Sequence, residues 1–290
     1  MTVYLNGKFM PIEEATIPVL DRGFIFGDGV YEVIPVYSRR AFRLSEHLKR
    51  LQSSLDGIRL PNPHSEAEWS KLISELIARN AGEDQYLYLH ITRGVAKRDH
   101  AFPQPPVQPT VFMMSSPLLH PAAELLASGV SAVTATDNRW LRCDIKAISL
   151  LPNVLLRQLA VDAGCAETIL LRHEADSGDD FITEGAASNI FLIKNNVLHA
   201  PPKNNLMLPG ITYDVVLELA AADHIAFEVR KIGKDELFGA DEILLTSSTR
   251  EVMPITTLDG KAVGNGKPGP MFARLYSLYQ NFKREVMRKP

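Results

Sequence analysis

Residues 139–151, RWLRCDIKAISLL, set a single lysine against an apolar run. Lys146 follows Asp144 and Ile145 and leads directly into the segment AISLL. Burying an ammonium group costs far more free energy than leaving it in water, so this position needs a reason. An ion pair with Asp144, or a stem that lets the amine reach solvent, is the ordinary explanation. The alternative is a neutral, nucleophilic amine of the kind that forms Schiff bases. The stretch by itself leaves both explanations open.

The composition is that of an ordinary globular protein. The chain has 290 residues, 46% hydrophobic and 22% charged, and this length predicts about two domains. The net charge of −3 argues against a general nucleic-acid-binding protein. The start, MTVYLNGKFM, lacks the basic and apolar regions of a signal peptide. No apolar run reaches the ~20 residues that span a bilayer. We therefore expect a cytoplasmic protein that binds neither nucleic acid nor membranes.

Turn signals and apolar periodicity predict a mixture of strands and helices in the first part of the chain. Asn6-Gly7 is a strong hairpin signal, and Ser45 is the expected N-cap of a helix whose Leu48, Leu51 and Leu55 lie on one face. The expected strands are 29–37, 40–44, 85–94 and 109–116, and the expected helices are 45–58 and 65–82. A proline-rich polar loop separates the last two strands.

The second part continues the mixture without strict alternation of strand and helix. Helices are expected at 153–164, at 210–224 and over the last twenty or so residues, with hairpins turning at Asn195-Asn196 and Asp259-Gly260. The pattern predicts an α+β fold class with mixed sheets and flanking helices. We expect a smaller domain over 1–118, a linker over 119–124 and a larger domain over 125–290.

Several common kinds of site do not fit. The glycine-rich segment GFIFGDGVYE precedes a strand and does not open a helix, so it is no dinucleotide fingerprint. His90 and His100 are separated by a loop and lack an obvious third ligand, which argues against a metal site. Ser188 lacks the surrounding glycines of a hydrolase nucleophile.

Other segments could bind an anion. LPGITYDVV (208–216) starts a helix after Pro209-Gly210, so the backbone amides of Ile211 and Thr212 could hold a phosphate, although many ordinary helices start in this way. Ser248 and Thr249 in TSSTREV could add contacts, or form a simple turn. Arg50 could face the same anion. Glu184, in DDFITEGAASNIFLI (179–193), needs a proton or a cation as partner if it is buried.

In their order along the chain, these segments resemble the class IV aminotransferases that use pyridoxal phosphate (PLP), and among them those that act on D-amino acids. The resemblance covers nearly the whole chain and implies the two-domain architecture known as fold type IV. The matching segments are DRGFIFGDGVYEV, EHLKRL, TRGVAKRDHAFP, RWLRCDIKAISLL, ITEGAASNIF, LPGIT and LTSSTREVMPI.

The resemblance implies a role for each candidate residue. Lys146 would bind PLP as a Schiff base and move the proton at the substrate Cα. Glu184 would pair with the pyridine nitrogen and keep it protonated. The remaining cofactor contacts would come from Arg50, Ile211, Thr212, Ser248 and Thr249 at the phosphate, Leu208 at a ring face and Ser188 at the polar edge.

The substrate assignment rests on the loop Arg98-Asp99-His100 together with Tyr31. In family members that act on D-amino acids, residues resembling Tyr31, Arg98 and His100 hold the substrate carboxylate, and the loop reaches into the neighbouring subunit. A guanidinium suits this task because it can bind a carboxylate through two parallel hydrogen bonds. The resemblance therefore implies a homodimer acting on amino acids such as D-alanine or D-glutamate, with pyruvate or 2-oxoglutarate as the 2-oxo acid.

Alternatives on the same scaffold are a branched-chain L-amino-acid aminotransferase, an (R)-amine transaminase and an aminodeoxychorismate lyase. A non-catalytic PLP-binding protein is a further alternative, and Lys146 together with Glu184 argues against it. The chain departs from the family at Tyr213, where an arginine is common, and at Ala187, where many members have a hydroxyl. The acidic segment 173–180 is longer than expected, and we expect it to form a surface loop.

Overall fold

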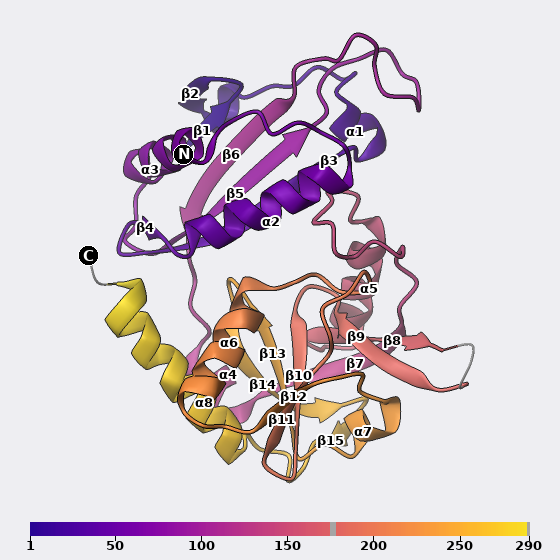
Figure 1. Ribbon diagram of the computed structural model, residues 1–290. Helices are drawn as coiled ribbons and strands as arrows, with labels where there is room; N and C mark the ends of the chain where they lie inside the picture. The colour runs from indigo at the N-terminus through magenta and orange to yellow at the C-terminus, as the bar shows by residue number, and fades with distance from the viewer. Residues whose placement is uncertain (175–177, 289–290) are drawn as a thin grey trace. The chain divides into compact units, whose positions relative to one another are not determined.

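The computed structural model describes residues 1–174 and 178–288. Backbone contacts divide the chain into two compact units (Figure 1). Unit 1 comprises Met1–Leu119, Ile145–Leu150 and residues 287–288, and unit 2 comprises His120–Asp144 and Leu151–Val286. The units differ from the expected continuous domains at residues 287–288 and at the segment Ile145–Leu150, which packs with unit 1 although its sequence neighbours belong to unit 2.

Unit 1 is a six-stranded sheet with two helices on one face. The strand order is β2-β1-β6-β5-β3-β4, and all neighbouring strands are antiparallel. The elements are β1 (Thr2–Leu5), β2 (Lys8–Pro11), η1 (Ile12–Glu14), α1 (Arg22–Phe26), β3 (Gly29–Tyr37), β4 (Arg40–Ala41), α2 (Leu44–Gly57), α3 (Glu66–Arg79), β5 (Gln85–Thr92) and β6 (Thr110–Pro117).

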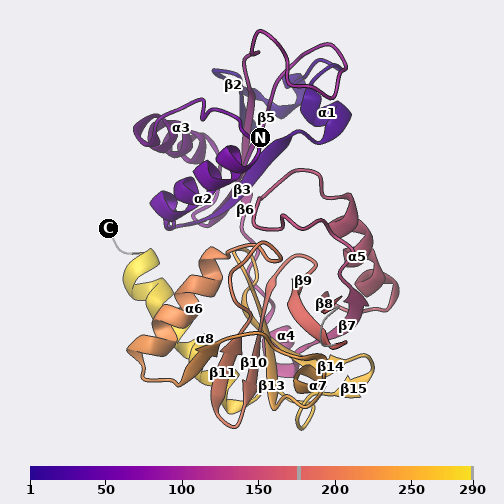
Figure 2. The ribbon, with the colours of Figure 1, turned by 45° about the vertical axis from the view of Figure 1, so that its right-hand side comes forward.

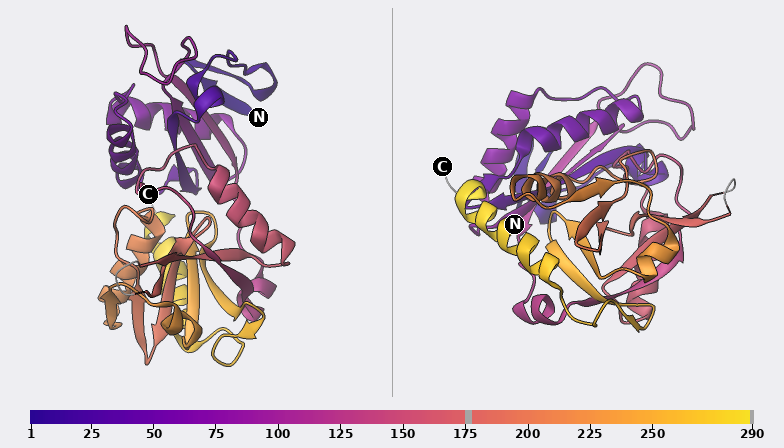
Figure 3. Two further views of the ribbon diagram at one scale, coloured as in Figure 1. Left: turned by 90° about the vertical axis from the view of Figure 1, so that its right-hand side faces the viewer. Right: turned by 60° about the horizontal axis from the view of Figure 1, so that its bottom comes forward.

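The core of unit 1 lies between the sheet and helices α2 and α3 (Figures 1 and 3). Leu48, Leu51 and Leu55 of α2 are all buried there, as their helical spacing predicts. Alternate residues of β3, such as Val30 and Ile34, point into the same core. The helix α3 starts with a complete capping box between Ser65 and Glu68.

The segment Ile145–Leu150 is held on the outer edge of β3. Tyr31 N donates to Lys146 O at 2.9 Å, and Ile148 N donates to Gly29 O at 3.1 Å. Ile145 and Ala147 point into the core of unit 1, whereas Lys146 between them remains half-buried. Lys146 stands at the centre of a tight turn, in which Ala147 N donates to Ile145 O at 2.8 Å, and its side chain therefore lies apart from those of its apolar neighbours.

Two glycines of the segment GFIFGDG make this close approach possible. A Cβ at Gly29 would lie 2.4 Å from Ile91 O and 2.9 Å from Ile148 Cδ1. Gly27 has φ +65°, and a Cβ there would lie 3.1 Å from Ser149 Cβ. The glycine-rich segment, which fits no phosphate-binding fingerprint, thus has a packing role beside Lys146.

Unit 2 is a strongly curved nine-stranded mixed sheet with helices packed on it (Figure 2). The main strand order is β12-β11-β10-β13-β14-β7-β8-β9, and β15 pairs with β14. The elements are α4 (Ala123–Ser128), β7 (Val130–Thr136), α5 (Leu151–Asp162), β8 (Glu167–His173), β9 (Asp180–Gly185), β10 (Asn189–Lys194), β11 (Val197–Ala200), α6 (Ile211–Ala222), β12 (Phe227–Val229), α7 (Lys234–Phe238), β13 (Glu242–Ser247), β14 (Glu251–Leu258), β15 (Lys261–Ala262), α8 (Pro270–Phe282) and the π-helical turn η2 (Lys283–Met287).

Both faces of this sheet are covered, so its strands consist of almost continuous buried runs. Helices α6 and α8 lie side by side against β13 and β14 (Figure 2). A second cluster, which includes Ile169, Leu192 and Ile255, fills the other side. A sheet buried on both faces favours uninterrupted apolar strands over alternating ones.

The predicted elements agree with the structure except at a few points. The helix expected at 45–58 starts one residue earlier at Leu44, so Ser45 lies inside the first turn and Arg43 occupies the N-cap position. The N-cap assignment of Ser45 was therefore wrong. The strand expected at 40–44 is only Arg40–Ala41. Helices α1, α4 and α7 and strands β9 and β12 were not predicted, because all five are short and lack a long apolar period.

We predict that Gly29→Ala destabilises the protein by about 1–3 kcal/mol, because the added methyl group overpacks the junction between β3 and the Lys146 segment. Gly233→Ala is the matched control: the nearest atom to its added Cβ is 3.7 Å away. Urea unfolding of both variants would measure the free energies. Equal losses in the two proteins would show that the junction tolerates the methyl group.

Candidate active site

Lys146 lies beside an aromatic side chain of β3. Its Nζ is 4.2 Å from the ring centroid of Tyr31, which is in turn 5.7 Å from the ring of Tyr88. Lys146 N donates to Ser54 Oγ at 3.1 Å, which ties this backbone to α2. The amine thus sits on a sheet edge that is fixed by main-chain hydrogen bonds, with a phenol ring next to it.

Arg50 is part of a buried charge cluster on the core side of β3. Its Nε and Nη2 donate to the two carboxylate oxygens of Glu32 at 2.8 and 2.7 Å. His47 Nδ1 lies 2.8 Å from Glu32 Oε2. Burial alone would raise the pKa of Glu32, but the charge and hydrogen bonds of Arg50 and the contact with His47 outweigh it and hold that pKa well below its usual range. The guanidinium of Arg50 is therefore already engaged with a carboxylate inside unit 1.

The loop with Arg98 and His100 is exposed, and both side chains lie beside Phe26. The Arg98 guanidinium carbon is 5.4 Å from the Phe26 ring centroid, and the His100 ring is 5.3 Å from it. A surface-exposed basic pair of this kind is available to an anionic ligand. Tyr31, Arg50, Lys146, Arg98 and His100 all belong to unit 1.

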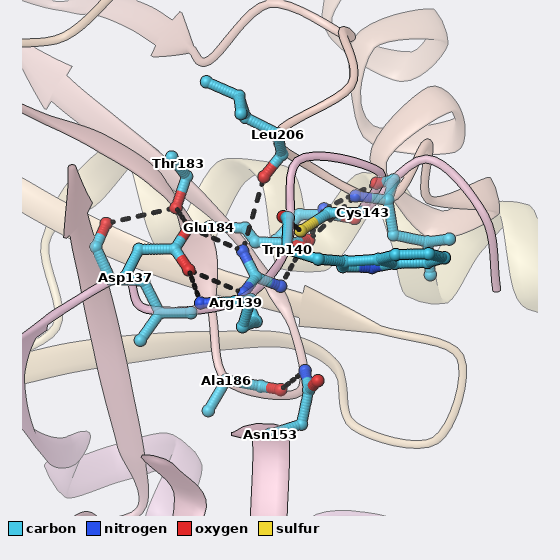
Figure 4. Close-up of polar contacts among 12 residues, drawn as sticks. Asp137, Arg139, Trp140, Cys143, Asn153, Thr183, Glu184, Ala186 and Leu206 are labelled. Carbon is cyan, nitrogen blue, oxygen red and sulfur yellow. Dashed lines mark hydrogen bonds and ion pairs between the residues drawn. The ribbon is translucent and has the colours of Figure 1, made fainter. Parts of the chain in front are cut away.

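Glu184, at the end of β9 in unit 2, is almost fully buried and is held by three donors, one of which is Arg139 (Figure 4). Arg139 Nη1 donates to its Oε1 at 2.6 Å. Asn189 Nδ2 and Leu208 N donate to its Oε2 at 3.1 and 3.2 Å. Burial raises the pKa of Glu184 to about 7, because it outweighs the charge and hydrogen bond of Arg139 and the Leu208 amide. The sequence expectation that a buried Glu184 needs a cation is thus met by Arg139.

Arg139 is in turn fixed by Asp137, two residues earlier (Figure 4). Its Nε and Nη2 donate to Asp137 at 2.9 and 3.0 Å, and Thr183 Oγ1 donates to the same carboxylate at 2.7 Å. Sequence reasoning assigned no role to Asp137 or Arg139. The available signal was the pair of opposite charges in TDNRW, directly after an apolar strand, near a carboxylate that needed a cation.

Helix α6 starts without a side-chain cap. Gly210 occupies the N-cap position, and a glycine has no side chain to cap the free amides of Ile211 and Thr212. A Cβ at Gly210 would lie 2.0 Å from Asn189 Oδ1, so the close approach of the Asn189 side chain leaves no room for a Cβ at this position. Leu208, just before it, is half-buried. The helix is long enough for its dipole to favour an anion at this end.

Ser188 has a different hydrogen-bond partner from the one expected. Its hydroxyl donates to Glu167 Oε2 at 2.8 Å, and Arg250 Nη2 donates to the same oxygen at 2.7 Å. A hydroxyl has one hydrogen, so Ser188 retains only acceptor capacity for a ligand. Ser248 and Thr249 lie half-buried in the turn between β13 and β14, where Arg250 N donates to Ser247 Oγ at 3.1 Å.

The departures noted in the sequence have local consequences. Tyr213 is buried, stacks on Phe191 with ring centroids 4.9 Å apart, and donates its hydroxyl hydrogen to Pro201 O at 2.9 Å. It is therefore a core residue of unit 2. Ala187 is exposed. In the segment 173–180, residues 175–177 lie outside the described residues.

The candidate residues thus form two groups. Unit 1 brings Tyr31 and Lys146 together and carries Arg50, Arg98 and His100, whereas unit 2 carries Glu184, Ser188, Leu208, Ile211, Thr212, Ser248 and Thr249. Within the described residues, no cluster of three or more His, Cys, Asp or Glu side chains could hold a metal ion. Within the same residues, no helix is both long and apolar enough to cross a bilayer.

Comparison with known proteins identifies relatives along the whole chain. The family model described as amino-transferase class IV matches residues 29–258. A D-alanine aminotransferase of Bacillus licheniformis is 42% identical over 281 residues, which cover 97% of this chain and 96% of that protein. A D-alanine aminotransferase of Staphylococcus epidermidis is 38% identical, with 97% of each chain covered.

A solved structure is similar along the whole chain as well. The branched-chain amino acid aminotransferase from Escherichia coli matches with a TM-score of 0.86 and 26% identity. The match covers 99% of this chain and 94% of that one.

The raised pKa of Glu184 predicts a pH-dependent stability in the ligand-free protein. The folded chain holds the carboxyl proton of Glu184 more tightly than the unfolded chain does. The stability that this proton contributes to folding is therefore fully present below the ordinary glutamate pKa and is lost as the pH rises through about 7. Urea unfolding at several pH values should show the wild type losing stability relative to Glu184→Gln as the pH increases. A constant difference between the two proteins would contradict the raised pKa.

Proposed function

The chain belongs to the class IV aminotransferases, and from this premise we propose that it transfers amino groups between D-amino acids and 2-oxo acids with PLP as its cofactor. D-Alanine and D-glutamate are the proposed donors, and pyruvate and 2-oxoglutarate the proposed acceptors. The observation that carries this proposal is the 42% identity to a D-alanine aminotransferase along almost the full length of both chains.

The residues present fit PLP. The free amides at the start of α6, which Gly210 leaves uncapped, suit a phosphate. A buried carboxylate backed by a guanidinium, as at Glu184, suits a protonated ring nitrogen. We propose that Lys146 binds the cofactor covalently and that the other contacts come from Arg50, Glu184, Ser188, Leu208, Ile211, Thr212, Ser248 and Thr249. Arg50 would do so while keeping its bidentate contact with Glu32.

Bound PLP supplies an electron sink for the charge that develops when the substrate Cα loses its proton. Lys146 Nζ would hold and move that proton, a role that suits an amine held at a fixed sheet edge. Glu184 and the ring nitrogen compete for one proton near neutral pH, because burial raises the pKa of the carboxyl to about 7. Arg139 favours the ionised carboxylate and thereby leaves the proton on the ring nitrogen.

Arg98, His100 and Tyr31 are the proposed carboxylate trap. A guanidinium and two further donors suit a substrate α-carboxylate, and fixing that group on one side selects which Cα–H faces Lys146. Both loop side chains are exposed in the single chain, as they would be if they served the site of a second subunit. The trap favours D-amino acids over the amines of an (R)-amine transaminase, which lack a carboxylate.

A homodimer and a cytoplasmic location are parts of the same proposal. Helix α5 exposes an apolar stripe of Leu151, Val154, Leu155 and Leu159, with exposed fractions from 48% to 69%. A contiguous exposed stripe of this kind is typical of a protein interface. Both cysteines are free thiols, as in proteins of a reducing compartment. Sedimentation equilibrium should give twice the chain mass of 32.2 kDa; a single-chain mass would contradict the dimer.

The half-reaction tests the function. The PLP-loaded protein is mixed separately with D-alanine, L-leucine and (R)-1-phenylethylamine, and the absorbance of the bound cofactor is followed. D-Alanine alone should change the spectrum, and Lys146→Ala should abolish the change, because the general base is lost. Conversion by L-leucine instead would assign the chain to the branched-chain enzymes, and full activity of Lys146→Ala would rule out this chemistry.

The trap makes a separate prediction. Arg98→Ala should raise KM for D-alanine on the order of tenfold or more, because a charge-assisted bidentate contact is lost. KM for a neutral amine that is accepted weakly should change little. Equal losses for the two substrates would show that Arg98 has a structural role.

A further inference from the structure

Arg22 lies at the base of the loop that carries Arg98 and His100, on helix α1 (Figures 1 and 2). Only 3% of its surface is exposed. Its Nη1 donates to Asp99 O at 2.6 Å and to Ala101 O at 3.3 Å, and its Nη2 donates to His100 O at 3.4 Å. One guanidinium therefore satisfies three consecutive carbonyl groups of the exposed loop.

The position of Arg22 is itself fixed by the residue before it. Asp21 is the N-cap of α1, is fully buried, and accepts hydrogen bonds from Thr92 at 3.1 Å and from Thr110 at 2.6 Å. These threonines belong to β5 and β6, the two strands that the loop connects. The carbonyls of residues 99–101 are thus tied through Arg22 and Asp21 to the sheet of unit 1.

The half-buried carboxylate of Asp28 balances the charge of Arg22. Arg22 Nε donates to Asp28 Oδ2 at 2.8 Å, and Arg93 binds both oxygens of Asp28 at 2.8 and 3.0 Å. Burial would raise the pKa of Asp28, but the hydrogen bonds and charges of Arg93 and Arg22 outweigh it and lower that pKa. Two guanidinium groups therefore share the Asp28 carboxylate beneath the loop.

The second arginine fixes the far end of the same loop segment. The Arg93 guanidinium carbon lies 3.8 Å from the ring centroid of Phe102, and that of Arg59 lies 5.4 Å from it. Arg93 Nη2 also donates to Ile58 O at 2.7 Å. The loop segment 98–102 is therefore held by hydrogen bonds at its carbonyls and by cation–π contacts at Phe102.

The side chains of Arg98 and His100 also contact helix α1. Phe26, one turn after Arg22 on α1, contacts the Arg22 and Arg98 guanidinium groups and the His100 ring. The backbone of the loop and the side chains of Arg98 and His100 thus all contact a single five-residue helix, α1.

We infer that Arg22 is a positioning residue of the substrate-carboxylate trap: it holds the carbonyls of residues 99–101 so that Arg98 and His100 are presented in one geometry. This inference rests on the proposed function of Arg98 and His100. The trap depends on two parallel hydrogen bonds to a carboxylate, and a misplacement of about 1 Å can cost on the order of a hundredfold in rate.

The experiment is a double-mutant cycle in the PLP-loaded enzyme. Arg22→Lys keeps the charge next to Asp28 but cannot reach three carbonyls. We expect it to raise KM for D-alanine on the order of tenfold, to change kcat by less than about twofold, and to leave the absorbance of the bound cofactor unchanged. On the Arg98→Ala background the same substitution should add less than about twofold, because the trap is already lost.

Arg39→Lys is the matched control. The Arg39 guanidinium also holds several backbone carbonyls, including Ile77 O at 2.8 Å and Gly82 O at 3.1 Å, but these lie at the end of α3. Its loss should affect stability and leave KM unchanged. Amide hydrogen exchange provides the readout that does not depend on turnover: Arg22→Lys should accelerate exchange in residues 95–109, and Arg39→Lys should not.

The outcomes distinguish the role of Arg22 from the proposed carboxylate-binding role of Arg98 and His100. If Arg98→Ala leaves KM for D-alanine unchanged, the trap itself is wrong and the role of Arg22 is wrong with it. If Arg98→Ala raises KM but Arg22→Lys does not, or if the two effects multiply in the double variant, only the role of Arg22 is overturned.

A second variant covers the case in which Arg22→Lys does not fold. Phe102→Leu removes the ring beneath Arg93 and Arg59 at a side chain that is 41% exposed, so no core cavity forms. It should raise KM for D-alanine several-fold and accelerate exchange in the same loop. An unchanged KM together with unchanged exchange would contradict the inference.

Discussion

The pairing of the segment Ile145–Leu150 with the edge of β3 is the constraint on which the proposed chemistry depends. Two main-chain hydrogen bonds, between Tyr31 and Lys146 and between Ile148 and Gly29, hold a segment whose sequence neighbours belong to the other unit. This pairing explains why apolar residues flank Lys146 in the sequence. The residues on either side of the lysine point into the core of unit 1, and the amine points away from it. The apolar run thus anchors the backbone, and the tight turn between Ile145 and Ala147 leaves the lysine half-buried beside the Tyr31 ring.

Two buried glutamates illustrate how the distribution of donors sets a pKa. Glu32 receives two nitrogen atoms of Arg50 and a contact from a histidine, and its pKa is lowered despite full burial. Glu184 receives only one nitrogen atom of Arg139, because the other two charged donors bind Asp137, and burial raises its pKa to about 7. The first glutamate is a permanent charge that orients Arg50. The pKa of the second lies near neutral pH, which suits the proposed sharing of a proton between Glu184 and the ring nitrogen of PLP.

Local signals predicted local structure well. The hairpin turns at Asn6-Gly7 and Asp259-Gly260 form with the positive φ angles that these residues tolerate, and Ser65 caps α3. Ser45 failed as an N-cap because the chain enters α2 through a left-handed residue, Arg43, and the helix starts earlier. Ser188 shows a similar limit. Its hydroxyl is drawn to Glu167, which lies at the start of a neighbouring strand, and no feature of the local sequence marks that acceptor.

The sequence by itself determined the α+β class, the longer helices and most of the strands, the family resemblance, and Lys146 and Glu184 as the proposed chemical groups. These depend on short-range periodicity, on turn residues and on the order of motifs along one chain. Tertiary structure decided the partners: Arg139 for Glu184, Glu32 for Arg50, and Arg22 for the carbonyls of the Arg98 loop. A charge that is removed from water must be balanced by whichever group the fold brings within a few ångströms, and that distance is set by packing between elements that lie far apart in sequence.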